Sequence, residues 1–436
     1  MKKILLPLII STLILITACK TRSQQTEDTQ TPTTKRSDTL VIHDAELNVN
    51  LDAFVSATKE PELEERIFDF STQFQRNISQ QQKLNFVSSP VSLYLAMGMI
   101  YEGAKNNTFD EIQKTMNFPD LDKFYPQISA YYGSLQNMNS DTNMQMNIAN
   151  KVYVEKSFQI LSEYKQNLNQ HFKAEIENVD FKNQFLKVEN QINKWVEKET
   201  KEKIKNLLPK NTLTKETLMV LVNAIYLKAS WRFPFEESQT TEKEFFINEK
   251  EKAKTKFMIQ QRKGIKHMSN KRVSVIELPY KTNHLSLVII LPQSSSNDKI
   301  NNWIPTHNEF QYYMNNVKPQ TVYMEIPKFK IESTYDLGET LSKMGIKEAF
   351  TNNADFSGIS SKKEAKIDKV IQKVFFEIDE KGTEAAAATA VVMTRITSAN
   401  PKPDVPVNFI ANKPFIFVLK ENTHHTPLFM GTFTKP

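Results

Sequence analysis

The sequence has little cysteine, glycine or tryptophan: one, nine and three residues of 436. A single cysteine excludes an intrachain disulfide, so the hydrophobic core must hold the fold. The scarcity of glycine and the absence of GxxxxGK[ST] argue against a phosphate-binding loop. HExxH and GxSxG are also absent, and no spacing of the seven histidines indicates a metal site or a catalytic triad. We therefore expect a protein that is not an enzyme and that uses no cofactor and no metal.

No charge of one sign dominates either. The chain has 56 lysines and arginines against 50 acidic residues, a net charge of +6, and segments such as 194–206 mix the two signs. Mixed runs are typical of solvated helix faces, so we expect no nucleic-acid or heparin site and no nucleic-acid partner. With 39% hydrophobic residues the chain can bury a large core.

The one long apolar run lies at the start of the chain. Lys2 and Lys3 precede thirteen residues, Ile4–Ile16, which are too few to span a bilayer because spanning takes about 20. We predict a signal peptide over 1–18. Residues 16–19, Ile-Thr-Ala-Cys, resemble a bacterial lipobox, which predicts acylation of Cys19; ordinary cleavage, with Cys19 lost or free, is the alternative. We expect an exported lipoprotein held on a membrane, and Lys20 points to the outer membrane or cell surface.

After Cys19 the sequence is polar. Residues 21–39 contain no large apolar side chain, which predicts a disordered tether over 19–61 with a reach of about 35 Å. Residues 40–55 are more apolar and are included in this linker. A folded domain is predicted from Glu62 to the end, over 62–436.

The folded domain begins with helical patterns and continues with strands. Leu63, Ile67, Phe70 and Phe74 form one apolar stripe, and Ser89-Pro90 predicts the start of a buried helix that ends at Gly103. A further helix is expected around Val188, Ile192 and Trp195. Strands are expected over 218–227, 272–280, 285–292, 321–326, 369–378, 415–420 and 427–433. This order predicts an α+β fold with mostly antiparallel sheets.

Residues 380–389, EKGTEAAAAT, follow directly on an alternating strand pattern. Val370, Gln372, Val374, Phe376 and Ile378 occupy one face of that strand. Taken alone, Glu384 and the four following alanines favour a short helix. The strand before them and the looser VVMTRITSANPKPDVP after them instead favour a mobile loop that can later become a strand.

The order and spacing of several blocks resemble the serpins, the serine protease inhibitors. The blocks are NFVSSPVSLYLAMGMIYEGAKNNT (85–108), LVNAIYLKASW (221–231), IPKFKIESTYDL (326–337), ADFSGIS (354–360), 380–389, NKPFIF and PLFMGTF. The resemblance covers about residues 62–436. It implies helices packed around three mostly antiparallel sheets, with an exposed reactive-centre loop over about 380–406. It also implies a monomeric suicide inhibitor that traps serine, or cysteine, endopeptidases as a covalent complex when the cleaved loop inserts into the central sheet.

The resemblance assigns residues to this mechanism. The loop hinge comprises Glu380, Gly382, Thr383, Glu384, Ala385, Ala386, Ala387, Ala388 and Thr389. After insertion Thr383, Ala385, Ala387, Thr389, Val391 and Met393 face inward, and no proline interrupts 380–400. The sheet-opening region comprises Ser89, Ser92, Asn223, Trp231, Lys328 and Gln372, with Lys328 paired to Glu380. The chain departs from the family at Gln372, where histidine is usual, and at Ala229, where glycine is usual.

The reactive bond is predicted between Ile396 and Thr397, and a loop one residue shorter places it between Arg395 and Ile396. The first suits elastase-like or subtilisin-like pockets, and the second suits trypsin-like enzymes. The alternative function is that of a non-inhibitory serpin acting as a surface binding or structural protein.

Overall fold

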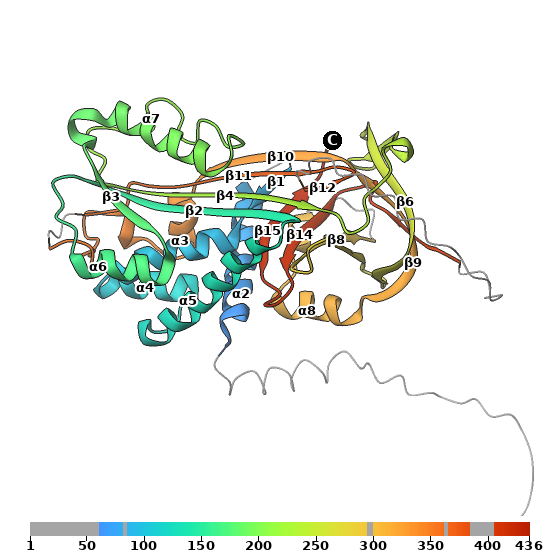
Figure 1. Ribbon diagram of the computed structural model, residues 1–436, viewed down its shortest axis with the longest axis horizontal. Coiled ribbons are helices and arrows are strands. Elements are labelled where there is room, and N and C mark those ends of the chain that lie inside the picture. Colours follow the sequence, from blue (N-terminus) through green and yellow to red (C-terminus); the bar gives the residue numbers. More distant parts are fainter. Residues whose placement is uncertain (1–60, 82–84, 294–299, 362–364, 384–404) are drawn as a thin grey trace, which may run out of the picture. The chain divides into compact units, whose positions relative to one another are not determined.

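Two β-sheets and the helices around them make up the computed structural model, which describes residues 61–81, 85–293, 300–361, 365–383 and 405–436 (Figure 1). The predicted signal peptide, Cys19 and the tether lie outside these ranges, as do residues 384–404. Among the described residues, no helix has the length and apolarity needed to cross a bilayer. The same residues contain no group of three or more side chains placed to hold a metal ion.

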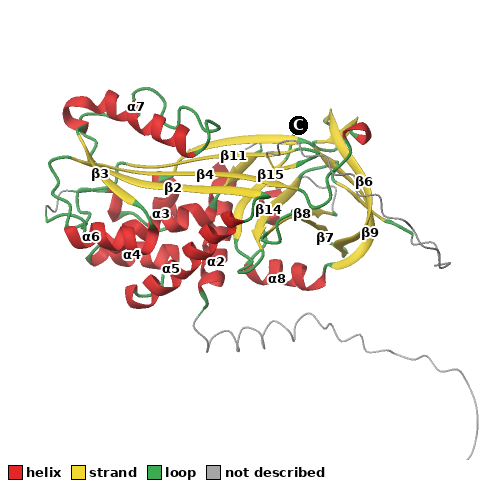
Figure 2. Cartoon of the chain, in the orientation of Figure 1, coloured by secondary structure: helices red, strands yellow, loops and turns green. Residues whose placement is uncertain are grey.

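The first sheet has six strands in the order β10-β11-β12-β4-β2-β3. The strands are β2 (Met144–Glu155), β3 (Glu175–Val179), β4 (Met219–Ser230), β10 (Phe329–Asp336), β11 (Lys369–Ile378) and β12 (Gly382–Thr383). Helix α7 (Phe181–Glu199) covers one face of this sheet (Figure 2). The helices on the other face are α2 (Leu63–Gln81), α3 (Pro90–Gly103), α4 (Asn106–Met116), α5 (Leu121–Asn137) and α6 (Ser162–Asn167).

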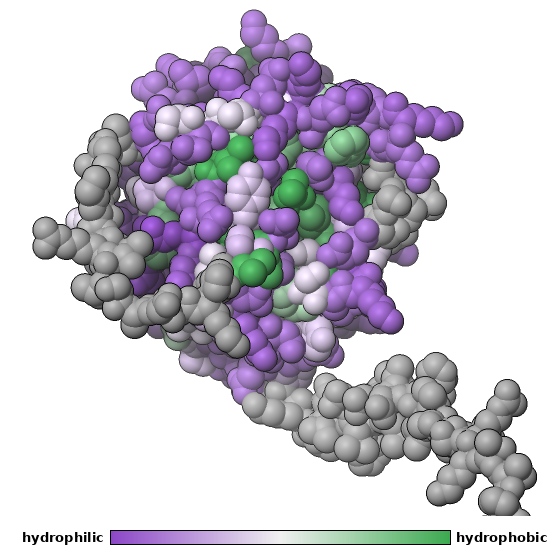
Figure 3. Space-filling model, turned by 90° about the vertical axis from the view of Figure 1, so that its right-hand side faces the viewer, coloured by the Kyte–Doolittle hydropathy of each residue, from purple (hydrophilic) through white to green (hydrophobic). Residues whose placement is uncertain are grey.

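The second sheet has nine strands in the order β1-β15-β14-β8-β7-β6-β9-β13, with β5 paired to β6. The strands are β1 (Phe86–Ser88), β5 (Thr241–Phe246), β6 (Lys252–Ser269), β7 (Val273–Pro279), β8 (Leu285–Pro292), β9 (Lys318–Pro327), β13 (Val407–Ile410), β14 (Phe415–Glu421) and β15 (Pro427–Phe433). The other α-helices of the described residues are α8 (His307–Asn316) and α9 (Gly338–Met344). The end of the molecule that carries β6 and β9 is mostly polar, with a few apolar side chains near its centre (Figure 3).

The resemblance implied three sheets, whereas the described strands form two. The reason is the length of β6: its first residues pair with β5, its middle pairs with β9 and its last residues pair with β7. One curved strand therefore joins, by continuous hydrogen bonding, what would otherwise be two sheets.

The predicted helices and strands all form. Leu63, Ile67, Phe70 and Phe74 are buried in α2. The Ser92 N–H donates to Ser89 Oγ at 3.4 Å, Pro90 opens α3, and every residue of that helix is buried. The expectation that strands follow the helices was incomplete, because β2 and β3 lie between α5 and α7. Their polar-rich sequences are held as strands by pairing, with β2 antiparallel to β4 and parallel to β3.

Candidate functional site at the centre of the six-stranded sheet

The centre of the six-stranded sheet contains two parallel strands that separate at one end. Residues Lys369–Val374 of β11 pair with Val220–Ile225 of β4, and we call this contact the seam. Beyond it the two-residue strand β12 lies between them and pairs antiparallel with both. Thr383 is opposite Ile378 on one side and opposite Ala229 on the other. We call this end, where a third strand begins, the fork.

Glycine is required at the turn into the fork. Gly382 has φ +151°, and a Cβ there would come within 2.1 Å of the Ala229 carbonyl oxygen. The Asp379 N–H donates to the Gly382 carbonyl at 2.9 Å, which closes the turn after β11. Any side chain at Gly382 would clash with β4, so the turn depends on the hinge glycine that the sequence indicated.

Thr383 is already buried at the fork, with 2% exposure. Its hydroxyl is hydrogen-bonded to that of Tyr280, and burial raises the pKa of Tyr280 although this bond opposes the rise. Trp231 stacks on Tyr280, with ring centroids 4.4 Å apart, and its Nε1 donates to the Asp379 carbonyl at 2.8 Å. Trp231 was expected at this point, whereas no sequence pattern indicated Tyr280.

The predicted ion pair lies beside the fork. Lys328 Nζ donates to Glu380 Oε2 at 2.8 Å, and Thr240 Oγ1 donates to Glu380 Oε1 at 2.9 Å. The side chain of Glu380 is only 7% exposed. Burial alone would raise the pKa of Glu380, but the hydrogen bonds from Lys328 and Thr240 leave it lowered. The carboxylate is therefore held ionised where the chain leaves β11.

Uncharged polar side chains bridge the seam itself. Gln372 and Asn223 are directly opposite each other, and Gln372 Nε2 donates to Asn223 Oδ1 at 2.6 Å. Gln372 also donates to the Ser89 carbonyl at 3.0 Å and accepts from the Ser89 N–H at 3.2 Å. Asn223 Nδ2 donates to Ser92 Oγ and to Asn150 Oδ1. We call these five residues the seam network.

The sequence indicated four members of the seam network and missed Asn150, which reaches it from β2. It also missed the Leu428 carbonyl of β15, which accepts from Ser89 Oγ at 2.7 Å. Ser89, Ser92, Asn223 and Gln372 have no solvent exposure. The amide of Gln372 can therefore bridge the strands by hydrogen bonds, as expected for a residue that replaces histidine.

Helix α7 and the loop 200–217, which we call the α7 layer, cover the outer face of the seam. Val188, Ile192 and Val196 belong to one apolar cluster with Val222 of β4 and Ile371 of β11. The buried carboxylate of Glu189 accepts the N–H groups of Asn211, Thr212 and Leu213 at 2.9–3.3 Å and so fixes the loop to the helix. The α7 layer thus contacts both strands of the seam.

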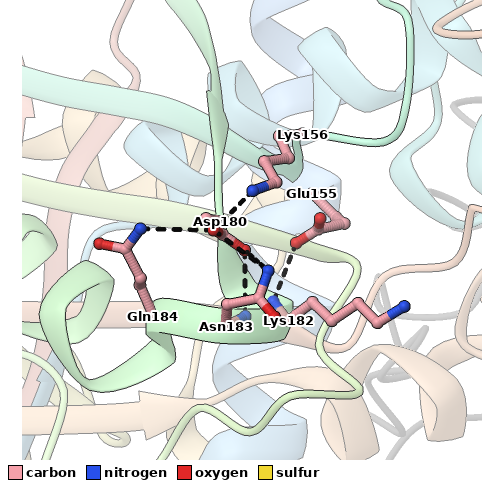
Figure 4. A network of polar contacts seen from close by, with 6 residues as sticks. All are labelled: Glu155, Lys156, Asp180, Lys182, Asn183 and Gln184. Carbon is pink, nitrogen blue, oxygen red and sulfur yellow. Dashed lines mark hydrogen bonds and ion pairs between the residues drawn. The ribbon is translucent and has the colours of Figure 1, made fainter.

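An ion pair and several hydrogen bonds connect the start of α7 to the end of β2 (Figure 4). Asp180 caps the helix by accepting from the Asn183 N–H at 3.0 Å, and it pairs with Lys156 at 2.6 Å. The hydrogen bond from Lys156 lowers the pKa of Asp180. Glu155, at the end of β2, accepts from the Lys182 N–H at 3.1 Å.

The structure thus brings together Ser89, Ser92, Asn223 and Gln372 at the seam, and Trp231, Lys328, Glu380, Gly382 and Thr383 at the fork. Glu384, Ala385, Ala386, Ala387, Ala388 and Thr389 lie outside the described residues. So do the predicted reactive bond at Arg395, Ile396 and Thr397, and the predicted lipidation site, Cys19.

Three comparisons show which known proteins the chain resembles. A family model described as "Serpin (serine protease inhibitor)" matches residues 65–436. Serpin B4 of Homo sapiens is 33% identical over 388 residues, covering 85% of this chain and 97% of that protein. Leukocyte elastase inhibitor of Homo sapiens is 32% identical over 369 residues, covering 81% and 93%. The crystal structure of Serpin48 from Tenebrio molitor has a TM-score of 0.76 at 29% identity, covering 87% and 99%.

These findings correct one expectation. The absence of familiar catalytic motifs led us to expect a protein that is not an enzyme. The family description and the relatives' names associate the chain with protease inhibitors, but they do not establish that it lacks catalytic activity. That expectation is therefore withdrawn.

Proposed function

Because the chain belongs to the serpin family, we propose that it inhibits serine endopeptidases as a suicide substrate, with cysteine endopeptidases as a further target class. A protease would cleave the reactive-centre loop and form an acyl intermediate with the new end. The loop would then insert into the seam and carry the protease with it. The observation that carries this proposal is the fork, where the first rung of an extra strand already lies between β11 and β4.

The strand registers at the fork and at the seam agree, because the offset between the two sites is the same on β11 and on β4. Thr383 is opposite Ile378 and Ala229, and Gln372 and Asn223 lie six residues earlier on the same two strands. An antiparallel strand that continued from Thr383 would therefore place Thr389 opposite both Gln372 and Asn223. Its inward face would consist of the small or uncharged side chains predicted from the sequence, and these would replace the bond between the two amides.

The energetics support insertion. Separating the strands breaks the bond between Gln372 and Asn223, which contributes about 1 kcal/mol, and the backbone hydrogen bonds of the seam, which bonds to the inserted strand would replace. About 14 new strand residues, each adding a hydrogen bond, together with apolar burial, would release on the order of 10 kcal/mol. That gain is as large as the stability of a typical domain, so the uncleaved form would be metastable.

The reactive bond and the location of the protein belong to the same proposal. Cleavage is proposed between Ile396 and Thr397, with Arg395–Ile396 as the alternative. The chain is proposed to be a bacterial lipoprotein with a signal peptide over 1–18, acylated Cys19, a tether over 19–61 and a monomeric inhibitory domain over 62–436. Metabolic labelling with a radioactive fatty acid, compared between the chain and its Cys19→Ala variant, tests the anchor.

The decisive experiment incubates the protein with subtilisin-like, elastase-like and trypsin-like proteases. We expect an SDS-resistant adduct with at least one of them, and sequencing of the released peptide would identify the reactive bond. If each protease cleaves the loop and dissociates without an adduct, inhibition is excluded. The non-inhibitory alternative would then account for the fold.

A further inference from the structure

The outer face of the α7 layer has an excess of positive charge. Residues 181–216 contain nine lysines and five glutamates, so they hold +4 of the chain's net charge of +6. Alternating signs in this stretch led us to expect an ordinary solvated face. The structure places three exposed lysines along one side of the helix.

Helix α7 has three acidic side chains: Glu197 is half-buried, and the other two are held by neighbouring groups. Glu189 is buried and binds loop N–H groups, and Glu199 is half-buried and accepts from Asn147 Nδ2 at 3.0 Å. Lys187, Lys194 and Lys198 are exposed, and their offsets of seven and four residues place them along one line of the helix. Within the described part of the chain, none of these three lysines forms an ion pair.

An exposed apolar side chain lies to one side of this line, about 100° around the helix axis from Lys187. Leu186 is 50% exposed and directly precedes Lys187. Lysines satisfy the negative headgroups of a bilayer, and a neighbouring leucine can enter its interfacial region. A soluble polyanion would gain from the lysines but not from the leucine. The combination therefore favours a membrane surface over a polymer.

We propose that this face, comprising Leu186, Lys187, Lys194 and Lys198, docks on an anionic lipid bilayer. The helix is about 28 Å long and presents the three lysines on one side, so all of them can reach a flat surface together. The proposal relies on the proposed function only for the lipid anchor, which would hold the domain near such a surface.

Binding should be measured with the full chain carrying Cys19→Ser, so that no acyl chain contributes. The probes are phosphatidylcholine vesicles with and without about one third phosphatidylglycerol. Each lysine near an anionic surface strengthens binding about fivefold. The triple variant Lys187→Gln, Lys194→Gln and Lys198→Gln should therefore bind the anionic vesicles on the order of a hundredfold more weakly. Leu186→Ser should weaken binding to these vesicles a few-fold.

A matched control removes the same charge elsewhere through Lys250→Gln, Lys271→Gln and Lys318→Gln, all at exposed positions. This control should weaken binding less than about threefold. If the two triple variants lost vesicle binding equally, net charge alone would explain the binding, and the proposal would be overturned. So would tight binding of inorganic polyphosphate to this face together with no effect of Leu186→Ser on vesicle binding. Cleavage-induced thermal stabilisation, measured on the same samples without vesicles, reports on the inhibitory function separately.

Discussion

The fork and the seam are two ends of the same pair of strands, yet they are held in different ways. At the fork a third strand has started, and its position is fixed by a glycine turn, a buried threonine and an ion pair. Along the seam the strands pair directly. Uncharged amides bridge them on the face that packs against α3, and the α7 layer covers the opposite face. In the proposed mechanism, insertion would therefore start at the fork and would be opposed at the seam by a network that a new strand could replace.

The largest effect is expected when a charged side chain is placed at the fork or at the seam, because the two substitutions should act at different stages. Thr383→Arg would bury an unpaired cation in the uncleaved protein, because Thr383 is already buried, and should lower its melting temperature by about 5 °C. Thr389→Arg should leave that temperature unchanged but abolish the SDS-resistant adduct, since its charge would be buried only after insertion. Glu384→Arg, expected to face outward, is the control. If Thr383→Arg and Thr389→Arg lowered the melting temperature equally, the proposed difference between the fork and the seam would be wrong.

The next effect concerns the seam network. Gln372→Leu would leave the Ser89 N–H and Asn223 Oδ1 without their partner, whereas the Ser89 carbonyl keeps its bond from the Leu93 N–H; the cost to the uncleaved form is about 2–3 kcal/mol. We expect a lower melting temperature and faster conversion to a form with the intact loop inserted, measured as loss of inhibitory activity over time. Gln372→His can keep one bridging bond and should be milder. A more stable Gln372→Leu variant would show that the network does not hold the seam.

A smaller effect tests a site away from both ends. Glu102 is buried near the end of α3, the helix whose first turn contacts the seam network, and burial raises its pKa to about 7. Because the folded form retains this proton, the stabilising contribution is complete below the ordinary pKa of 4.5 and is lost as the pH rises through about 7. The melting temperature should therefore fall by a few degrees between pH 6 and pH 8. Glu102→Gln should remove this fall, whereas Glu163→Gln should not.

The smallest effect concerns the ion pair at the fork. The pKa of Glu380 is lowered, so its contribution is present above the ordinary value of 4.5 and is lost as the pH falls through the folded value. Lys328 is partly exposed, which limits the contribution to about 1 kcal/mol. Lys328→Met should lower the melting temperature slightly at pH 7 and weaken its dependence on acid. If Lys328→Met left the fall of the melting temperature at acid pH unchanged, the ion pair would not stabilise the fork.

Local patterns made much of this comparison predictable. The alternation in 369–378, the cap at Ser89 and the glycine at 382 each reflect a requirement of the backbone that the sequence displays directly. The resemblance then identified residues that lie far apart in the chain, such as Lys328 and Glu380. Tyr280 and Asn150 could not be found in this way, because their roles arise from pairing between distant strands.

The arrangement of charge on α7 was also hidden from the sequence. Lysines and glutamates alternate along 194–206, and only tertiary contacts show that Glu189 is buried and that Glu199 is hydrogen-bonded to Asn147. The mixed signs gave no information on orientation, since burial of the carboxylates depends on the loop 200–217 and on β2. The orientation of these carboxylates therefore follows from tertiary contacts, which composition does not reveal.

The central claim is that the uncleaved protein lies uphill of a form in which the loop has filled the seam. The most direct test compares the melting temperature of intact protein with that of protein cleaved once within 384–404. We predict that cleavage raises it by at least about 10 °C, as a strand inserts and the seam opens to receive it. An identical melting temperature for the intact and cleaved forms would contradict the account.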